Sequence, residues 1–428
     1  MKRMIIRAGL LLLAATALLP GFPRAQEAPL LPRNARLAIA GDSITEQKIY
    51  SRYIETYLLA CAGRRDISVF QFGWSGETAP EFAARMANDL GAFFKPTAMT
   101  TCYGMNDGRY RPYEETIGKN YEAGMRAIIK KARELGVTTV IVGSPGAVDT
   151  NFFQKSGTGA AEYNANLRQL GNLAREIAAE YKASFADVHA PLIEAMARAK
   201  AVLGENYDVC GRDGVHPGSN GHLVMAYAFL KALGCDGNIG EISVNRQGGT
   251  AVSSGHRVLS STGGEIKLES ERYPFCYDPD PRSSSSNRSI LPFLPFNQEL
   301  NRFILKVPEL ASARARVAWG NESKEFTAGQ LASGINLAAE FDRTPFDGAF
   351  QKVQQSVAVQ QYFQTRAIRS LVTNLRAFAD DEISGGAEWQ NAVNVLIQKL
   401  KARDDQFQAA VRAAIIPVQH TIVITPLP

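Results

Sequence analysis

Several patterns that mark particular classes of protein are absent from this 428-residue sequence. Lysine and arginine are scattered without a basic run and the net charge is only +5, so no nucleic-acid partner is expected. The five cysteines include no CxxC pair and no metal-ligand spacing, so no metal site is predicted. No internal repeat is visible. The rest of the composition, with 45% apolar and 21% charged residues, is typical of a globular protein.

A long apolar run is also missing at the N-terminus, where Leu10–Leu19 is shorter than the roughly 20 residues that span a bilayer. The run follows the positive charges of Lys2, Arg3 and Arg7. This pattern is typical of a secretory signal peptide. We therefore expect residues 1–25 to be removed, and the mature protein to be exported to the periplasm or beyond without a stable membrane anchor.

The cysteines are spread widely along the chain, and export permits a disulfide. Cys210 with Cys235, or Cys235 with Cys276, are candidate pairs between which the sequence does not choose. Cys102 lies in an apolar segment and is expected to be a buried free thiol. Cys61 is left without an assigned partner.

Residues 34–236 alternate between strand-like and helix-like segments. Strands are predicted at 37–41, 67–73, 96–104, 137–145 and 183–188. Helices are predicted at 49–62, 79–90, 120–136, 162–181 and 221–234. Such alternation favours a parallel sheet covered by helices on both faces, which is a three-layer α/β domain.

The pattern changes in residues 239–428, which predict a β-rich accessory module, interpreted as a sandwich. A passage rich in Pro and Ser, residues 278–296, is predicted to be a long loop. Residues 346–414 are mostly helical in pattern and form an insertion. The final segment, 420–426, is predicted to be a strand that returns to complete the sheet.

Candidate catalytic residues follow the predicted strands of the first domain. Ser43 comes directly after the first strand, Gly76 after the second and Asn106 after the third, while Asp213 and His216 precede the last helix. Loops that leave one edge of a rigid sheet bring side chains together. Taken alone, Ser43 and its neighbours would only cap a helix; the convergence favours a catalytic role.

Each of these residue types has a chemical task. A serine hydroxyl needs a base to take its proton, and His216 is the candidate. A carboxylate such as Asp213 fixes the imidazole tautomer and stabilises the imidazolium. An oxyanion needs donors that already point at it. The backbone N–H groups of Ser43 and Gly76 and the amide of Asn106 are the predicted donors.

The four stretches GDSI, WSGET, GMND and DGVH resemble the four sequence blocks of the SGNH (GDSL) hydrolase superfamily. The resemblance covers about half the chain. It implies a flavodoxin-like α/β/α sandwich, a Ser43–His216–Asp213 triad, an oxyanion hole of Ser43, Gly76 and Asn106, and hydrolysis without metal or cofactor. GDSI in place of GDSL is a swap of similar volume and is expected to be harmless.

The residues around the predicted site bear on the substrate class. Trp74, Tyr103, Asp107 and Tyr110 flank the oxyanion blocks and are candidates for substrate binding. No wide apolar stretch marks a tunnel for a long acyl chain. Together with what the resemblance implies, these features favour an exported carbohydrate acetylesterase. The alternatives are a lipase or thioesterase acting on lipid or aryl esters, and a non-enzymatic glycan- or envelope-binding protein; the oligomeric state is left open.

Four further histidines are not expected to take part in the chemistry. His189 and His222 are predicted to serve packing or capping. His256 and His420 lie in the β-rich half with no acidic cluster around them.

Overall fold

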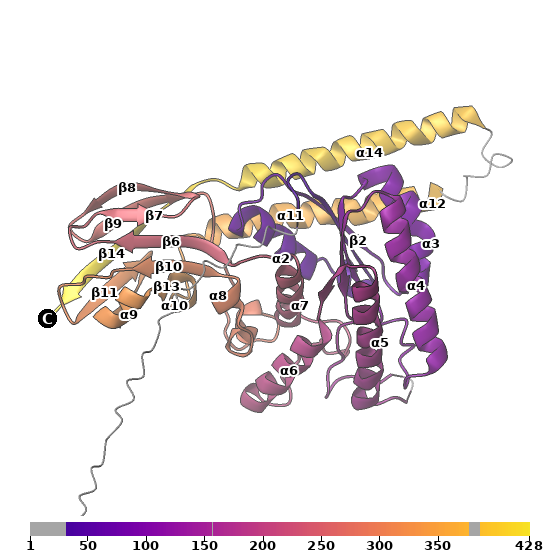
Figure 1. Cartoon of the computed structure of the whole chain (residues 1–428), viewed down its shortest axis with the longest axis horizontal. Coiled ribbons are helices and arrows are strands. Elements are labelled where there is room, and N and C mark those ends of the chain that lie inside the picture. Colours follow the sequence, from indigo (N-terminus) through magenta and orange to yellow (C-terminus); the bar gives the residue numbers. More distant parts are fainter. Residues whose placement is uncertain (1–30, 156, 376–385) are drawn as a thin grey trace, which may run out of the picture.

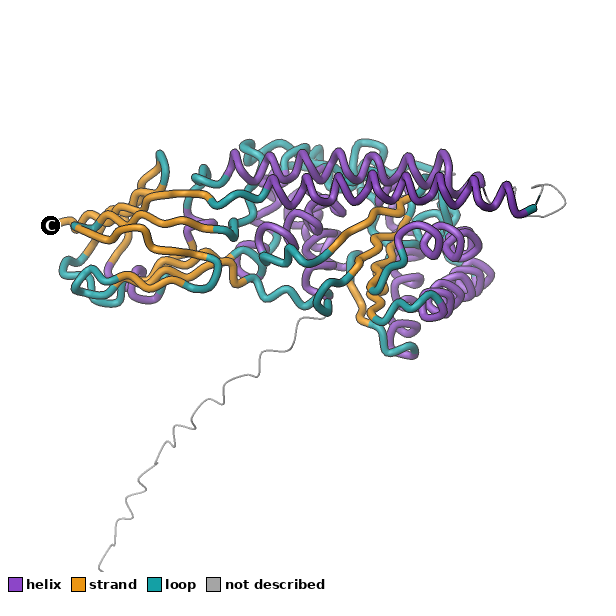
Figure 2. The backbone as a smooth tube through the Cα atoms, turned by 90° about the horizontal axis from the view of Figure 1, so that it is seen from above, coloured by secondary structure: helices purple, strands orange, loops and turns teal. Residues whose placement is uncertain are grey.

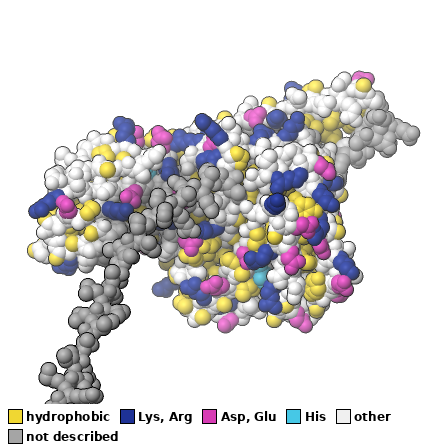
Figure 3. All heavy atoms as spheres, in the orientation of Figure 1, with side chains coloured by type: hydrophobic (Ala, Val, Ile, Leu, Met, Phe, Trp, Pro, Cys, Tyr) yellow, Lys and Arg dark blue, Asp and Glu magenta, His cyan; other side chains and the backbone are white. Residues whose placement is uncertain are grey.

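The computed structural model describes residues 31–155, 157–375 and 386–428 (Figure 1). The expected signal peptide, residues 1–25, lies outside the described residues. Among the residues described, no helix is both long and apolar enough to cross a bilayer. Lys and Arg side chains are dispersed over both halves of the face shown in Figure 3 and are mixed with Asp and Glu.

The first half of the chain is built on a five-stranded parallel sheet with the order β2-β1-β3-β4-β5. The strands are β1 (Arg36–Gly41), β2 (Ser68–Gly73), β3 (Ala98–Cys102), β4 (Thr139–Gly143) and β5 (Ser184–Ala186). The strand order changes direction beside β1, and open α/β sheets bind ligands at such a point, at the carboxyl ends of the strands. This confirms the predicted flavodoxin-like fold and places Gly41 at the edge where a site is expected.

Both faces of the sheet are covered, because successive residues of a strand point to opposite sides. Leu37 and Ile39 of β1 join one hydrophobic cluster, and Ala38 and Ala40 join the other. The first face packs against α2 (Tyr50–Thr56), α6 (His189–Leu203) and α7 (Ser219–Ala232). The second packs against α3 (Ala79–Asp89) and α4 (Glu115–Glu134), with α5 (Ala160–Glu180) beside α4. Helix α6 was not predicted, although its buried residues Leu192, Ala195, Met196 and Ala199 recur at helical spacing.

The C-terminal half adds two sheets. Their orders are β13-β10-β6-β7 and β12-β11-β14-β9-β8. The strands are β6 (Asn238–Val244), β7 (Thr250–Val252), β8 (His256–Thr262), β9 (Glu265–Ser270), β10 (Arg302–Lys306), β11 (Arg314–Trp319), β12 (Glu322–Thr327), β13 (Ile335–Asn336) and β14 (Val418–Leu427). The terminal strand β14 lies between β11 and β9, antiparallel to both. The last strand of the chain therefore joins β11 and β9, which come earlier in the sequence, into one sheet.

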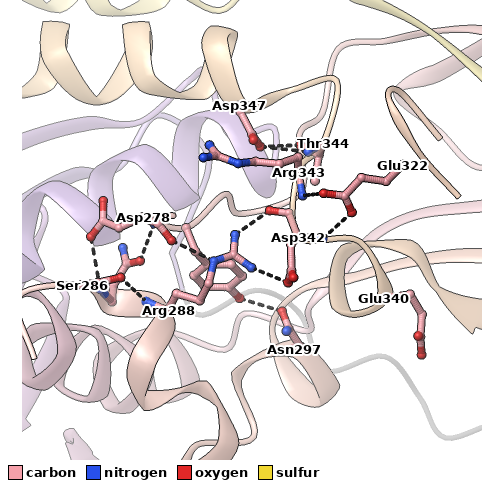
Figure 4. Close-up of polar contacts among 12 residues, drawn as sticks. Asp278, Ser286, Arg288, Asn297, Glu322, Glu340, Asp342, Arg343, Thr344 and Asp347 are labelled. Atoms are coloured by element: carbon pink, nitrogen blue, oxygen red, sulfur yellow. Dashed lines mark hydrogen bonds and ion pairs between the residues drawn. The ribbon is translucent and has the colours of Figure 1, made fainter. Parts of the chain in front are cut away.

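The predicted long loop at 278–296 contains helical turns, which corrects the sequence-based expectation. Residues Asn287–Phe293 form the 3₁₀-helix η3, and Phe296–Glu299 form the short helix α8. Arg288 joins this passage to the loop around Asp342, as Figure 4 shows. Its guanidinium donates to the backbone oxygen of Asp278 at 2.8 Å and to the carboxylate of Asp342 at 2.9 Å. Neighbouring short helices are α9 (Ala328–Ser333) and α10 (Leu337–Glu340).

Two long helices, α11 (Asp347–Ala367) and α14 (Ala387–Ala414), run side by side (Figure 2). The π-helical turn η4 (Ile368–Val372) and the short α12 (Thr373–Leu375) follow α11. The helices are inserted between β13 and β14 of the β-rich half, yet α11 packs against α2 and β2 of the first half. The predicted helical insertion therefore covers the α/β domain.

Strand β2 is the edge of the parallel sheet, and side chains of these helices complete its hydrogen bonds. The backbone oxygen of Val69 accepts from the side-chain amides of Gln360, Gln364 and Gln408 at 3.1–3.2 Å. The N–H of Gln71 donates to Oε1 of Gln364 at 3.1 Å. An open sheet edge exposes unpaired backbone groups. Here the buried glutamines pair with those groups.

All five cysteines are unpaired thiols. Neither candidate disulfide, Cys210–Cys235 or Cys235–Cys276, is present. Cys102 is a buried free thiol as predicted, with its Sγ 3.6 Å from the backbone oxygen of Ser144.

Candidate active site

Ser43 is the first residue of α1 (Ser43–Glu46), immediately after β1. Gly41 is required here by lack of space. A Cβ at Gly41 would lie 2.1 Å from Oγ1 of Thr45 and 2.8 Å from the backbone oxygen of Cys102. Gly41 is not among the residues with positive φ, so backbone conformation does not require a glycine at this position. The helix cap is Asp42, whose Oδ1 accepts from the N–H of Ile44 at 3.0 Å, so the Ser43 hydroxyl is not used for capping.

Ser43, His216 and Asp213 are joined by hydrogen bonds. Oγ of Ser43 lies 2.8 Å from Nε2 of His216, and Nδ1 of His216 lies 2.5 Å from Oδ2 of Asp213. The other oxygen of Asp213 accepts the backbone N–H groups of Val215 and His216 at 3.0 and 2.9 Å. Burial would raise the pKa of Asp213, but these hydrogen bonds outweigh it and hold the pKa below its usual value. The carboxylate is therefore charged and the imidazole is held in one orientation.

Gly76 lies in a tight turn that follows β2. The N–H of Glu77 donates to the oxygen of Trp74 at 3.2 Å, which closes a four-residue turn. Gly76 occupies its third position with φ of 79°, a conformation that favours glycine. A Cβ at Gly76 would meet nothing within 4 Å, and the residue is exposed. Its conformation explains the glycine, and its exposure leaves the backbone open to a ligand.

The side-chain amide of Asn106 is oriented by two partners. Its Nδ2 donates to the backbone oxygen of Glu77 at 3.1 Å, and its Oδ1 accepts from the hydroxyl of Tyr110 at 3.0 Å. Tyr110 has a positive φ of 54°, as does its neighbour Arg109 at 59°. Such angles in bulky residues are strained and cluster at functional sites. The Tyr110 ring lies beneath Nζ of Lys155, 4.3 Å from its centroid.

Two of the residues predicted to bind substrate are buried. Asp107 accepts the N–H of Ala79 and that of Gly104, both at 3.0 Å, and burial raises its pKa to about 6. Tyr103 is fully buried and donates its hydroxyl to Glu77 at 2.9 Å. The structure therefore corrects these two assignments: Asp107 joins two loops beneath the site, and Tyr103 belongs to the core.

Trp74 is partly exposed and lies between two arginines. The guanidinium carbons of Arg85 and Arg369 are each 4.8 Å from its ring centroid. Arg85 is buried and paired with Glu77 and Asp89 at 2.5 and 2.8 Å. Arg369 comes from η4, in the C-terminal half.

Sequence reasoning missed Arg369 and Glu46. Arg369 forms an ion pair with Glu46, the last residue of α1, across 323 positions of sequence. The other oxygen of Glu46 accepts the N–H of Ser75 at 2.6 Å. Burial would raise the pKa of Glu46, but Ser75 and Arg369 outweigh it and lower the pKa. No local motif surrounds Arg369, so the sequence offers no signal for it.

The Ser-rich passage of the C-terminal half reaches the other side of the site. Oγ of Ser284 donates to Asp208 at 2.6 Å, and the backbone oxygen of Ser284 lies against Gly218, two residues beyond His216. The β-rich half therefore supports the loop that carries the histidine.

The remaining histidines are structural, as predicted. Burial lowers the pKa of His222 to about 3, and its Nε2 is 2.9 Å from Oε1 of Gln47. His189 is buried with Nδ1 2.8 Å from the oxygen of Gly146. His256 and His420 share Oγ of Ser270 in the β-rich half. Among the described residues no group of His, Cys, Asp or Glu is arranged to hold a metal.

A cavity of about 890 Å³ lies elsewhere, between the two halves of the chain. Its lining includes Tyr57, Arg272 and Arg302 and none of the residues around Ser43. Its arginines donate to backbone oxygens, for example Arg272 to Cys61 at 2.9 Å. The cavity is separate from the candidate active site.

Comparison with known proteins agrees with this geometry. Residues 39–224 match the GDSL-like lipase/acylhydrolase family. A curated acetylxylan esterase of Geobacillus stearothermophilus is 28% identical over 193 residues, which is 43% of this chain and 80% of that protein. The structure of a gut microbial diltiazem-metabolizing enzyme is 22% identical, with a TM-score of 0.72 over 93% of this chain and 99% of that one. That likeness shows a shared fold that extends through the C-terminal half.

The α/β domain of this chain belongs to the SGNH/GDSL hydrolase superfamily. The protein is accordingly an enzyme that hydrolyses ester bonds.

Proposed function

We propose that this protein is an exported serine esterase that removes small acyl groups, most specifically acetyl, from carbohydrate. The observation that carries the catalytic part is the continuous hydrogen-bonded chain from Ser43 through His216 to Asp213. Asp213 keeps the proton of the imidazole on Nδ1, which leaves Nε2 to accept the proton of Ser43.

The reaction proceeds in two stages. Oγ of Ser43 bonds to the acyl carbon as its proton moves to Nε2 of His216, and the alcohol then leaves with that proton. A water molecule then attacks the acyl carbon as its proton moves to Nε2 of His216. The bond from that carbon to Oγ of Ser43 breaks as the proton passes to Oγ, and the acid is released. In both stages an oxyanion forms, and the N–H groups of Ser43 and Gly76 and the Nδ2 of Asn106 donate to it. Asn106 has a second Nδ2 hydrogen for this purpose, because the first is donated to Glu77.

The substrate class rests on the curated relative, which is an acetylxylan esterase. Export rests on the N-terminal pattern of the sequence alone, and the fraction of the cell that contains the mature chain would test it.

Hydrolysis assays test the proposal directly. We expect turnover of p-nitrophenyl acetate and release of acetate from acetylated xylan, with rates that fall as the acyl chain lengthens. Ser43→Ala should reduce kcat by about 10³-fold or more. Equal activity of wild type and Ser43→Ala would refute the serine mechanism. A preference for long acyl chains would favour a lipase or thioesterase, and binding of glycan without turnover would favour a binding protein.

A further inference from the structure

We infer that Arg369, supplied by the C-terminal half, is a positioning residue for the oxyanion donor Gly76. The inference rests on the proposed function, because Gly76 matters to the chemistry only if it stabilises an oxyanion. Among the described residues, the contacts of the Arg369 side chain are the Glu46 carboxylate and the Trp74 ring, so its effect on the chemistry passes through other residues.

The turn Trp74–Glu77 has few internal restraints. Ser75 and Gly76 are exposed, and the turn is closed by one long hydrogen bond from Glu77 to Trp74. A positive φ at Gly76 is a conformation that glycine leaves readily, because glycine populates both signs of φ. Glu77, which ends the turn, is fixed by Arg85 and Tyr103 through its side chain and by Asn106 through its backbone oxygen. The start of the turn has no such buried anchor, so the direction of the Gly76 N–H also depends on what holds Trp74 and Ser75.

Both preceding residues are held by groups that Arg369 contacts. The carboxylate of Glu46 accepts the N–H of Ser75 at 2.6 Å on one oxygen and pairs with Arg369 on the other. The guanidinium of Arg369 also lies over the Trp74 ring at 4.8 Å, and Arg85 is at the same distance from that ring. Arg369 thus restrains Trp74 and Ser75, the first two positions of the turn.

The same ion pair reaches the nucleophile. Glu46 is the last residue of α1, a helix of four residues that begins at Ser43. A single side chain from η4 therefore joins the helix of the nucleophile to the loop of an oxyanion donor. The C-terminal half is in this respect part of the catalytic unit.

The test compares Arg369→Ala with Arg366→Ala as a matched control. Arg366 lies one turn earlier, on α11, is exposed, and donates to the hydroxyl of the exposed Tyr362 at 3.0 Å. We expect Arg369→Ala to lower kcat for p-nitrophenyl acetate about 10- to 100-fold with KM changed less than threefold, which is the pattern of an interaction made in the transition state. Arg366→Ala should match wild type. Arg369→Lys should recover most of the rate, because it keeps the charge opposite Glu46.

A double variant and an exchange measurement separate positioning from general stability. Glu46→Gln combined with Arg369→Ala should be no slower than the slower single variant, because both act through one ion pair. Amide hydrogen exchange at Ser75 to Glu77 should be faster in Arg369→Ala than in Arg366→Ala, with unchanged exchange in β3. A rate within twofold of wild type for Arg369→Ala, or unchanged exchange in the turn, would overturn the inference. If wild type itself hydrolysed no ester, the proposed function would fail, and exchange in the turn would still decide whether Arg369 holds it.

Discussion

Asp213 is tied to the His216 loop by three contacts, and it is half exposed. One oxygen receives the imidazole Nδ1–H, while the other receives two backbone N–H groups that shape the loop. The carboxylate thus sets both the tautomer of His216 and the path of the chain that carries it.

These contacts give the first prediction. Asp213→Asn retains the shape of the side chain but presents a poorer acceptor to Nδ1, so His216 loses its preferred tautomer. We expect kcat to fall by about 10²- to 10⁴-fold, less than for His216→Ala, since His216 itself transfers the proton. Steady-state kinetics on p-nitrophenyl acetate would measure this. If kcat fell in Asp213→Asn by as much as in His216→Ala or by more, the carboxylate would do more than orient the ring.

At the scale of single residues, the sequence predicted which side chains meet at the sheet edge and missed side chains that contact them from distant segments. Ser43 and Asn106 follow strands in short motifs, so their convergence follows from the strand order, while His216 precedes the last helix of the α/β domain. The orientation of Tyr103 and Asp107 depends on partners from other loops, and residue type alone did not show that both are buried. Arg369 needs tertiary contacts over hundreds of positions, which no local pattern encodes.

Helices α11 and α14 show why a polar helix face need not face solvent. Gln360, Gln364 and Gln408 are buried against the edge of β2, where each donates to the oxygen of Val69. In sequence these glutamines are typical of an exposed surface. The helical pattern was therefore predicted from spacing, while the face that packs on the α/β domain was not.

The second prediction concerns Gln364, which both accepts from Gln71 and donates to Val69 and Asp404. Gln364→Leu would leave a buried backbone N–H without a partner, at a cost of about 1–3 kcal/mol in the free energy of unfolding. Urea unfolding would measure it. Gln355→Leu, at an exposed position of the same helix, is the control and should change little. Equal stability of the two variants would mean that the side chain does not complete the sheet edge.

Across the whole molecule the two halves share one polar interior. Glu55 of α2 accepts from Gln360 and Gln361 of α11 at 2.8 and 2.7 Å, and burial raises its pKa to about 8. Asp404 of α14 accepts from Gln364 of α11 at 2.9 Å, and burial raises the pKa of Asp404 to about 6. The α/β alternation and the change of pattern near residue 236 were visible in the sequence. This shared interior was not, because it depends on packing between distant segments.

These raised pKa values determine how stability depends on pH. A carboxyl group whose pKa is higher in the folded than in the unfolded chain binds more protons when the chain is folded. Its contribution to the free energy of unfolding is therefore complete below its unfolded pKa near 4 and is lost as pH rises through its folded pKa. For Glu55 the loss falls between about pH 4.5 and 8.

The variant Glu55→Gln stays neutral at every pH in this range. We therefore expect the free energy of unfolding of wild type to fall relative to that of Glu55→Gln by on the order of 1 kcal/mol or more between pH 5 and pH 9. Urea unfolding at both pH values would measure the difference, with the exposed Glu309→Gln as control. A difference between wild type and Glu55→Gln that stayed constant with pH would show that Glu55 is not held neutral at the contact between the two halves.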